Sequence, residues 1–311
     1  MDAEFYHEPV MTKEVIESLV VNRAGIYVDC TVGGGGHSRA ILKETSGQVV
    51  GIDCDEEAIA FAEKKLAEFG GRKILVKANF ADLGTILKNL NIDQVDGVLI
   101  DLGVSSHQLD ARQSGFSFNQ EAPLDMRMDC TAGLSAYDIV NGFGPDELEK
   151  IIRAYGEEKM AGRIARAIIK KRSLSPIETT TELAQIVVSV MPSQMRRQKI
   201  HPATRTFQAI RIAVNQELSN IRPAIHDAAD VLKPGGRLCV ISFHSLEDRI
   251  VKNEIRDLEG GCVCPKEVPV CVCHREAKME NLTRKVIVPS PEEIESNPRA
   301  RSAKLRVARR I

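Results

Sequence analysis

The stretch YVDCTVGGGGHS, residues 27–38, decides the fold. It begins as a short apolar strand, continues as four glycines (Gly33–Gly36) and enters a segment of helical periodicity near 37–45. Glycine reaches positive φ and lets the backbone approach a ligand closely, and the N-terminus of a following helix favours negative charge. The stretch therefore predicts either a ligand-binding strand–loop–helix unit or a tight turn without a ligand.

The residues that follow repeat the alternation of strand and helix. Apolar strands are expected at 25–30, 49–53, 73–78 and 95–102, with helices between them at 37–45, 55–68 and 82–90. Such short, nearly continuous apolar strands predict a parallel sheet that is covered on both faces. The strand pattern returns at 236–243, and 284–289 and 304–308 are two further candidate strands.

A different pattern separates the two groups of strands. Residues 103–130 are rich in Gly, Ser, Asp and Pro and predict a long loop, and residues 135–232 are almost entirely helical in pattern, including helices at 157–172, 204–218 and 220–232. We therefore expect a discontinuous α/β domain, residues 1–104 and 215–311, that is interrupted by a helical insertion, residues 105–214.

Composition limits the class of protein. The 311 residues are 43% hydrophobic and 27% charged, which is typical of a globular protein with a core and excludes wholesale disorder. No apolar run reaches the ~18 to 20 residues of a membrane helix, and the opening MDAEFYHEPV lacks the apolar region of a signal peptide. We therefore expect a cytoplasmic protein.

Charge is divided unevenly along the chain. Residues 1–150 hold 13 basic and 25 acidic residues (−12), whereas residues 151–311 hold 29 and 18 (+11). This asymmetry predicts either a surface that binds an anion such as nucleic acid or two lobes that attract each other.

Three residues around the glycines narrow the choice of ligand. Asp53 ends the second strand 20 residues after Gly33, where an acidic side chain accepts hydrogen bonds from ribose hydroxyls. Ser38 stands where a dinucleotide fingerprint has its third glycine. The carboxylate of Asp29 suits the cationic amino-acid end of S-adenosylmethionine. Asp29-x-x-x-Gly33-x-Gly35 resembles the first motif of class I methyltransferases, and an NAD-type oxidoreductase is the alternative.

Asp101 ends the fourth strand, in DLGVSS (101–106). Enzymes that methylate exocyclic amines often carry an Asp or Asn here, followed by Pro-Pro and an aromatic, because acceptors that bind the amine hydrogens favour its nucleophilic form. The Pro-Pro-aromatic part is absent, so Asp101 either acts on an amine, holds the cofactor or caps the next turn. Phe80 follows the third strand, where it is expected either to contact an adenine ring or to belong to the hydrophobic core.

Nine segments carry a resemblance to one known family: HEPV (7–10), GGGGHS (33–38), DLGVSS (101–106), GFSF (115–118), PLDMRMD (123–129), YGEE (155–158), HPATRTFQAIRIAVN (201–215), GGRLCVISFHSLEDRIVK (235–252) and NPRARS (297–302). They are specific and span nearly the whole chain. The sequence is similar to the RsmH (MraW) family, the bacterial ribosomal small-subunit RNA (cytosine-N(4)-)-methyltransferases.

The resemblance implies a Rossmann-like class I S-adenosylmethionine-dependent methyltransferase domain with a helical insertion for substrate recognition. It implies methylation of the 4-amino group of one cytidine in the decoding region of small-subunit (16S) ribosomal RNA. Asp101 is the candidate catalytic residue because of its place at the end of the fourth strand. S-adenosylmethionine is the implied cofactor, and the implied cofactor contacts are Gly35, Gly36, His37, Asp53, Phe80, Asp101 and Gln108. The expected partner is the ribosomal RNA or the assembled small subunit, without a membrane; a homodimer stays open. A non-catalytic RNA-binding protein with a relic cofactor fold is a further alternative.

Other segments have two interpretations each. Thr204, Gln208, Arg211 and Asn215 form a polar stripe on one helix, which either contacts RNA or is a solvated face. The same choice applies to Arg163 and Arg166 with KKR (170–172), and to RARSAKLRVARR (299–310). PLDMRMD and SFHSLEDR (242–249) are candidates for the cytosine pocket, with His244 as a guess for a general base.

The last segment of interest is a group of cysteines. Two C-x-C pairs, Cys262 with Cys264 and Cys271 with Cys273, lie close together and are followed by His274. They predict either a structural zinc site, although the spacing within each pair is one residue short of the usual, or a reduced surface loop.

Overall fold

The computed structural model describes residues 9–103, 114–131, 133–196, 201–261, 273 and 275–311. The chain divides into two compact units, residues 1–103 with 218–311 (the α/β unit) and residues 104–217 (the insertion unit). The expected boundaries after 104 and 214 differ from these by one and three residues. None of the described helices combines the length and the apolar character that a bilayer crossing requires.

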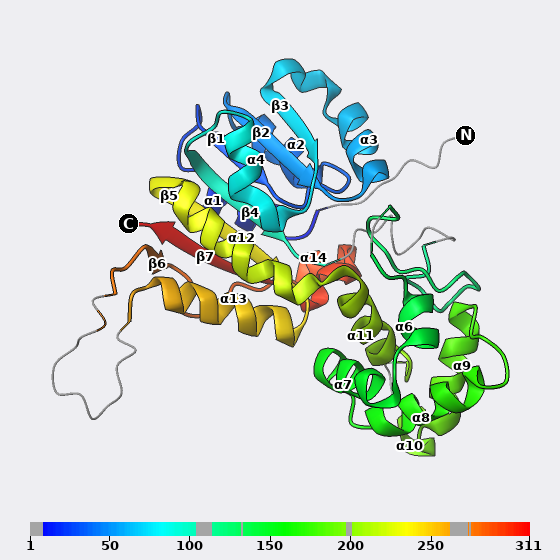
Figure 1. Ribbon diagram of the computed structural model, residues 1–311. Helices are drawn as coiled ribbons and strands as arrows, with labels where there is room; N and C mark the ends of the chain where they lie inside the picture. Colours follow the sequence, from blue (N-terminus) through cyan, green and yellow to red (C-terminus); the bar gives the residue numbers. More distant parts are fainter. Residues whose placement is uncertain (1–8, 104–113, 132, 197–200, 262–272, 274) are drawn as a thin grey trace. The chain divides into compact units, whose positions relative to one another are not determined.

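The α/β unit is built on a seven-stranded sheet of order β3-β2-β1-β4-β5-β7-β6 (Figure 1). The strands are β1 (Ile26–Asp29), β2 (Gln48–Asp53), β3 (Lys73–Lys77), β4 (Val95–Asp101), β5 (Leu232–Ser242), β6 (Met279–Asn281) and β7 (Lys304–Arg310). The first five strands of that order pair in parallel, whereas β7 is antiparallel to both β5 and β6. The expected doubly wound, Rossmann-like sheet is confirmed.

One expected strand is wrong. Residues 284–289 form no strand; the short β6 precedes them, and only an isolated bridge joins Ile287 to Leu305. Pro289, which has no backbone N–H to donate, limits pairing beyond this bridge.

Helices cover both faces of the sheet. On one face lie α1 (Thr12–Leu19), α2 (Gly36–Glu44) and α3 (Glu56–Lys65), and on the other α4 (Leu83–Asn89), α12 (Glu217–Val231) and α13 (Ser245–Leu258). Each face has its own hydrophobic core. In β4, Val98 and Ile100 are fully buried in the core beneath α4, α12 and α13, and Leu99 is fully buried in the core beneath α1, α2 and α3, because side chains alternate along a strand. Short elements complete the unit: η1 (Ala67–Arg72), η2 (Phe80–Asp82), α14 (Pro291–Ser296) and η3 (Pro298–Ser302).

The order of the strands defines a switch point in the sheet. β1 is paired with β2 on one side and with β4 on the other, so the strand order reverses between β1 and β4. In open α/β sheets, ligands bind outside the carboxyl ends of the strands at such a switch point. The glycine loop follows β1 and Asp101 ends β4, so both lie at this point.

The insertion unit is helical and has its own core. Its helices are α6 (Ala136–Gly142), α7 (Pro145–Gly156), α8 (Ala161–Arg172), α9 (Thr180–Val190), α10 (Ser193–Arg196) and α11 (Thr204–Asn215). α8 begins four residues later than expected, because Glu157 takes a left-handed conformation (φ 48°) that ends α7. Gly156 is required there, since a Cβ at this position would lie 2.5 Å from the carbonyl oxygen of Arg205 in α11.

Candidate active site

The glycine loop turns sharply between β1 and α2. Gly33 (φ 47°) and Gly35 (φ 73°) both take left-handed conformations, and the Gly35 N–H donates to the Val32 carbonyl over 2.7 Å. A Cβ on Gly36, the first residue of α2, would lie 3.0 Å from the ring of Pro9. Side chains larger than hydrogen would therefore strain or fill this loop.

Ser38 has a structural role in the first turn of α2. It is fully buried, and its hydroxyl donates to Oδ2 of Asp29 over 2.7 Å. Asp29 is itself 1% exposed, and burial raises the pKa of its carboxyl although His37 and Ser38 oppose the shift. Dinucleotide-binding loops have a glycine at this position. Here Ser38 takes its place and links α2 to the end of β1. The expected pairing of Asp29 with a cationic ligand stays a prediction.

His37 and Asp101 meet at the switch point. Nε2 of His37 lies 3.6 Å from Oδ2 of Asp101, and the Thr31 hydroxyl accepts a hydrogen bond from the Asp101 backbone N–H over 2.8 Å. Burial opposes a charged imidazole, but the adjacent Asp101 carboxylate, with help from Asp29, outweighs it and raises the pKa of His37. This environment therefore favours the protonated form of His37 more than water does.

Asp53 closes the loop from the neighbouring strand. Its carboxylate accepts hydrogen bonds from the backbone N–H of Gly33 (2.8 Å) and of Asp55 (3.0 Å). Burial raises the pKa of Asp53 to about 6, although these two hydrogen bonds lower it. Phe80 follows β3 at the start of η2 and is partly buried against the core.

The structure brings most of the predicted cofactor contacts to one edge of the sheet. Gly35, Gly36 and His37 follow β1, and Asp53 and Asp101 end β2 and β4. Direct contact joins His37 to Asp101, whereas Gln108 lies outside the described residues. Thr31 and Ser38 were not predicted to hold Asp101 and Asp29, because a single Thr or Ser near a glycine loop carries no distinctive signal in one sequence.

Unpartnered polar atoms test whether a ligand fits here. In the described part of the chain, both ring nitrogens of His37 and Oδ1 of Asp101 are buried and have no hydrogen-bond partner. Buried polar groups are otherwise almost always paired. Two imidazolium N–H donors suit a carboxylate, and a carboxylate oxygen suits a cationic or amine group. The arrangement fits a zwitterionic amino acid attached to an adenosine whose ribose reaches Asp53.

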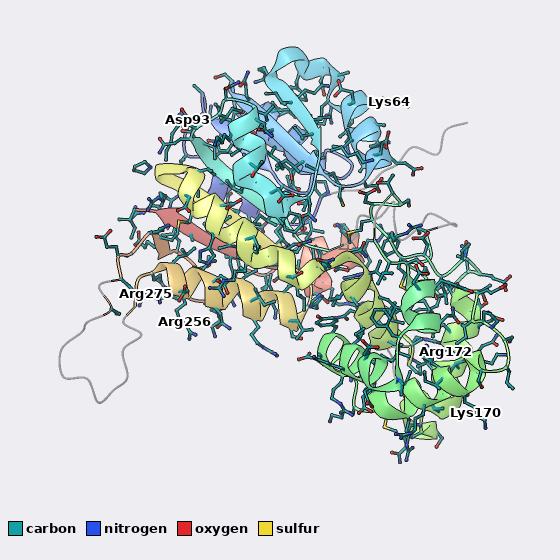
Figure 2. All side chains as sticks on the ribbon, viewed as in Figure 1. Lys64, Asp93, Lys170, Arg172, Arg256 and Arg275 are labelled. Carbon is teal, nitrogen blue, oxygen red and sulfur yellow. The ribbon has the colours of Figure 1, made fainter. Side chains whose placement is uncertain are left out.

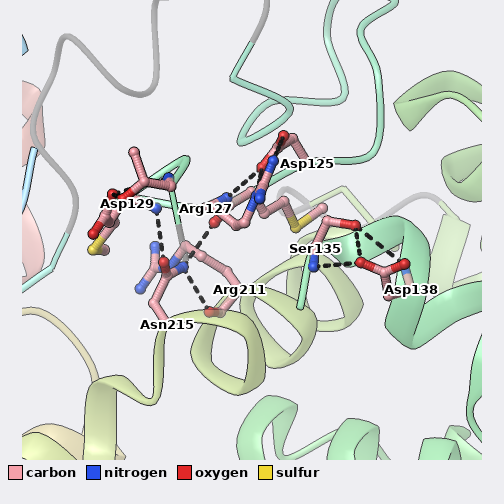
Figure 3. Close-up of polar contacts among 10 residues, drawn as sticks. Asp125, Arg127, Asp129, Ser135, Asp138, Arg211 and Asn215 are labelled. Carbon is pink, nitrogen blue, oxygen red and sulfur yellow. Dashed lines mark hydrogen bonds and ion pairs between the residues drawn. The ribbon is translucent and has the colours of Figure 1, made fainter. Parts of the chain in front are cut away.

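In the insertion unit, α11 holds the loop that carries PLDMRMD (Figure 3). The side-chain amide of Asn215 donates to the Met126 carbonyl (2.7 Å) and accepts from the Met128 N–H (2.8 Å). Met126 is fully buried and left-handed (φ 59°). Arg127 forms two hydrogen bonds of 2.8 Å with Asp125, which lower the pKa of that carboxyl.

The polar stripe on α11 has partners inside the insertion unit. Arg211 forms two hydrogen bonds of 2.8 Å with Glu217, and Gln208 donates to the Tyr155 carbonyl over 3.4 Å. Together with Asn215, these side chains bond within the insertion unit. The polar residues of the stripe thus have a structural role inside the unit, and a contact of this helix with RNA stays a prediction.

His244 also has a local role. It is the N-cap of α13 and accepts from the Glu247 N–H (3.4 Å), while the Glu247 carboxylate accepts from the N–H groups of Phe243 (2.7 Å) and His244 (3.1 Å). This capping box gives His244 and Glu247 a structural role, and the role of His244 as a general base stays a prediction.

Two groups of residues are candidates for metal ligation. Cys262, Cys264, Cys271 and His274 lie outside the described residues, so the predicted zinc site stays a prediction. Within the described α/β unit, His226, Glu254 and Asp257 come close enough together for metal ligation. Two arginines already form ion pairs with those carboxylates: Arg222 with Glu254 (3.4 Å) and Arg275 with Asp257 (2.8 Å).

Comparison with known proteins identifies the family. The chain is 58% identical over 98% of both chains to "Ribosomal RNA small subunit methyltransferase H" of Syntrophus aciditrophicus, and 51% identical over 99% of this chain and 100% of the protein of the same name from Clostridioides difficile. A solved rRNA methylase from Streptococcus thermophilus is 12% identical with a TM-score of 0.42, covering 96% of this chain and 93% of the other. The model of the MraW methylase family matches residues 4–311. This chain belongs to the MraW methylase family.

Proposed function

We propose that this chain transfers a methyl group from S-adenosylmethionine to the exocyclic 4-amino group of a cytidine in the decoding region of small-subunit ribosomal RNA. Membership of a methylase family supports the reaction class, and the printed names of the relatives support the RNA. The observation that carries the proposal is that the buried ring nitrogens of His37 and Oδ1 of Asp101, beside the glycine loop, have no hydrogen-bond partner in the described structure. No specific observation favours the dehydrogenase or the relic alternative.

The chain's own residues would hold the cofactor as follows. The glycine loop (33–36) admits the ligand close to the backbone, and Asp53 accepts from the ribose hydroxyls. His37 offers N–H donors to the carboxylate of the amino acid. Phe80 and Gln108 stay proposed contacts. When bound, S-adenosylmethionine supplies an electrophilic methyl group on a sulfonium.

Asp101 is the proposed catalytic residue. Its Oδ1 is a buried acceptor without a partner in the described structure, so it can accept a hydrogen of the cytosine amine. That hydrogen bond favours the pyramidal nitrogen, whose lone pair is otherwise delocalised into the ring. Transfer would form one C–N bond as the C–S bond of the sulfonium breaks and leaves a thioether, and the amine would then lose one proton to water. Because the sulfonium charge is lost in the transition state, positioning and exclusion of water provide most of the rate.

The proposed substrate also suggests where the protein acts and what it binds. We propose the cytoplasm as the location, the ribosomal RNA or the assembled small subunit as the partner, and substrate recognition as the role of the insertion unit. A homodimer stays a prediction.

The test uses labelled S-adenosylmethionine and small ribosomal subunits that lack the modification, followed by digestion to nucleosides. We expect label in N(4)-methylcytidine for the wild type, and its loss in Asp101→Ala. Asp93→Ala, an exposed carboxylate before β4, is the matched control and should keep full activity. Label in another nucleoside contradicts the assigned base. No label, with the cofactor still bound in calorimetry, contradicts the function and favours the RNA-binding alternative.

A further inference from the structure

Helix α8 has an unusual charge content. Between Ala161 and Arg172 it carries five basic residues and no acidic one. Its neighbours in the insertion unit differ, because α7 begins with Asp146 and Glu147 and α9 has Glu182 in its first turn. The basic residues of α8 therefore need an explanation beyond the general surface composition of the unit.

The positions of these residues divide them into two kinds. Arg163, Arg166 and Lys170 are exposed, and we call them the α8 basic face; their spacing of three and four residues places them along one side of the helix. Arg172 is different, because its guanidinium donates to the carbonyl oxygens of Val140 and Phe143, both over 2.6 Å, at the end of α6. Figure 2 labels Lys170 and Arg172 on this helix.

The stability of the helix does not explain the α8 basic face. The partial positive charge at a helix N-terminus disfavours a cation in the first turn, where Arg163 stands. Arg163 and Arg166 are an i,i+3 pair, and Arg166 and Lys170 an i,i+4 pair, so like charges repel along the face. Lys170, in the last turn, suits the helix dipole, but Arg163 and Arg166 do not stabilise the helix.

Neighbouring carboxylates do not neutralise this face. In the described residues, no carboxylate lies within 4.0 Å of Arg163, Arg166 or Lys170, in contrast to the ion pairs seen elsewhere on the molecule. Glu149 of α7 lies against Gly162 but is paired with Arg153 over 2.6 Å. Lys171 is left out of the face because it lies near Glu182 and helps to lower the pKa of that carboxyl, after the backbone hydrogen bonds from Glu178 and Thr179.

We propose that the α8 basic face binds consecutive phosphate groups of the RNA backbone. Arginine and lysine side chains contact phosphates without reading sequence, and such contacts fix the position and register of the protein on the nucleic acid. From Arg163 to Lys170 the face extends about 10 Å along the helix axis. This inference rests on the proposed function, because RNA is the substrate proposed there.

A lipid surface fits the same face less well. A helix that binds membranes presents an apolar face for insertion beside its cations. The apolar side of α8 is instead used inside the unit, where Ile164, Ala165 and Ile168 are buried in the core. The face thus offers charge without an apolar anchor, which matches a polyanion in solution.

The test measures RNA binding as a function of salt, without methyl transfer. The variant is Arg163→Gln/Arg166→Gln/Lys170→Gln, and the control is Lys43→Gln/Lys64→Gln/Lys88→Gln, which removes three exposed helical lysines from the α/β unit. The probe is a transcript of small-subunit ribosomal RNA. Each lost phosphate contact lowers the slope of log K against log salt by about 0.7 for single strands. We expect the slope to fall by about 2 in the variant and to stay unchanged in the control.

The expected slope has a direct consequence for affinity. Raising salt from about 50 to about 200 mM should weaken wild-type binding roughly 20-fold more than binding of the variant. In methyl transfer, KM for the RNA should rise, while kcat and the affinity for S-adenosylmethionine should not change. An unchanged slope, or an equal loss in the control, overturns the proposal. So does loss of binding to anionic lipid vesicles in the variant with RNA binding intact.

These outcomes separate two kinds of failure. If the wild type binds the transcript but transfers no methyl group to small subunits that lack the modification, the proposed function fails and the salt slopes still report on the α8 basic face. If methyl transfer proceeds and the slopes of variant and wild type agree, only the assignment of the face fails.

Discussion

Asp53 makes the stability of the protein depend on pH in an unusual direction. Its pKa is raised from 3.8 to about 6 in the folded chain, mainly because burial disfavours the charged carboxylate. A carboxyl with a raised pKa destabilises the fold once it ionises, so its contribution grows as pH rises from the unfolded value near 3.8 to about 6 and is constant above that. The full effect is about 3 kcal/mol, from 1.36 kcal/mol for each pKa unit.

The perturbation is Asp53→Asn, which removes the titration. Between about pH 5 and pH 8, wild type should lose roughly 1.4 kcal/mol of unfolding free energy relative to the variant, because part of the effect has already developed at pH 5. The amide can accept only one of the hydrogen bonds from Gly33 and Asp55, and that loss does not change with pH. It therefore shifts the difference between the two proteins by a constant.

The assay is urea unfolding of both proteins without cofactor, repeated at several pH values. Taking the difference between wild type and variant cancels the titration of all groups that they share. A difference that stays flat across this range, or that changes in wild type's favour as pH rises, would refute the reasoning, because either result means that Asp53 ionises in the folded chain at least as easily as in the unfolded one.

Two further substitutions follow from the same contacts. Asn215→Ala removes both hydrogen bonds to the 125–129 loop and should lower the unfolding free energy by about 2 kcal/mol. Urea unfolding measures this, with Asn89→Ala as an exposed control. Equal unfolding free energies of the two variants would show that the hydrogen bonds of Asn215 to the loop do not stabilise the fold. Ser38→Ala leaves Asp29 buried without its hydroxyl partner and should cost about 2 kcal/mol. A change below about 0.5 kcal/mol, the range of ordinary surface substitutions, would show that the bond does not contribute.

The sequence predicts the sheet well where apolar runs are strong. The strands near 49–53 and 95–102 are continuous apolar runs because both faces of the sheet are covered, and both were found. The run at 284–289 looks similar but stays outside the sheet. Pattern alone cannot distinguish such a segment from an edge strand, because pairing depends on residues distant in sequence.

The candidate site divides in the same way. Residues at the ends of β1, β2 and β4 were predictable, because parallel strands bring their carboxyl ends to one edge. The 3.6 Å approach of His37 to Asp101 was not, since it depends on how α2 leaves the loop. The capping contact of His244 and the loop contacts of Asn215 were also missed. A sequence does not show whether a polar side chain bonds to the protein backbone or to a ligand.

The strand order has a consequence for biosynthesis. β4 pairs with β5, yet residues 102–231, 130 residues, separate the two strands in the chain. At about 5 to 20 residues per second, a ribosome needs roughly 7 to 26 s to make that segment. The insertion unit, whose core comes from a continuous stretch, is complete before β5 exists. During this interval β4 can pair only with β1, and its other edge, which carries the apolar run 98–100, has no strand partner. That edge is a hazard of misassembly in the nascent chain.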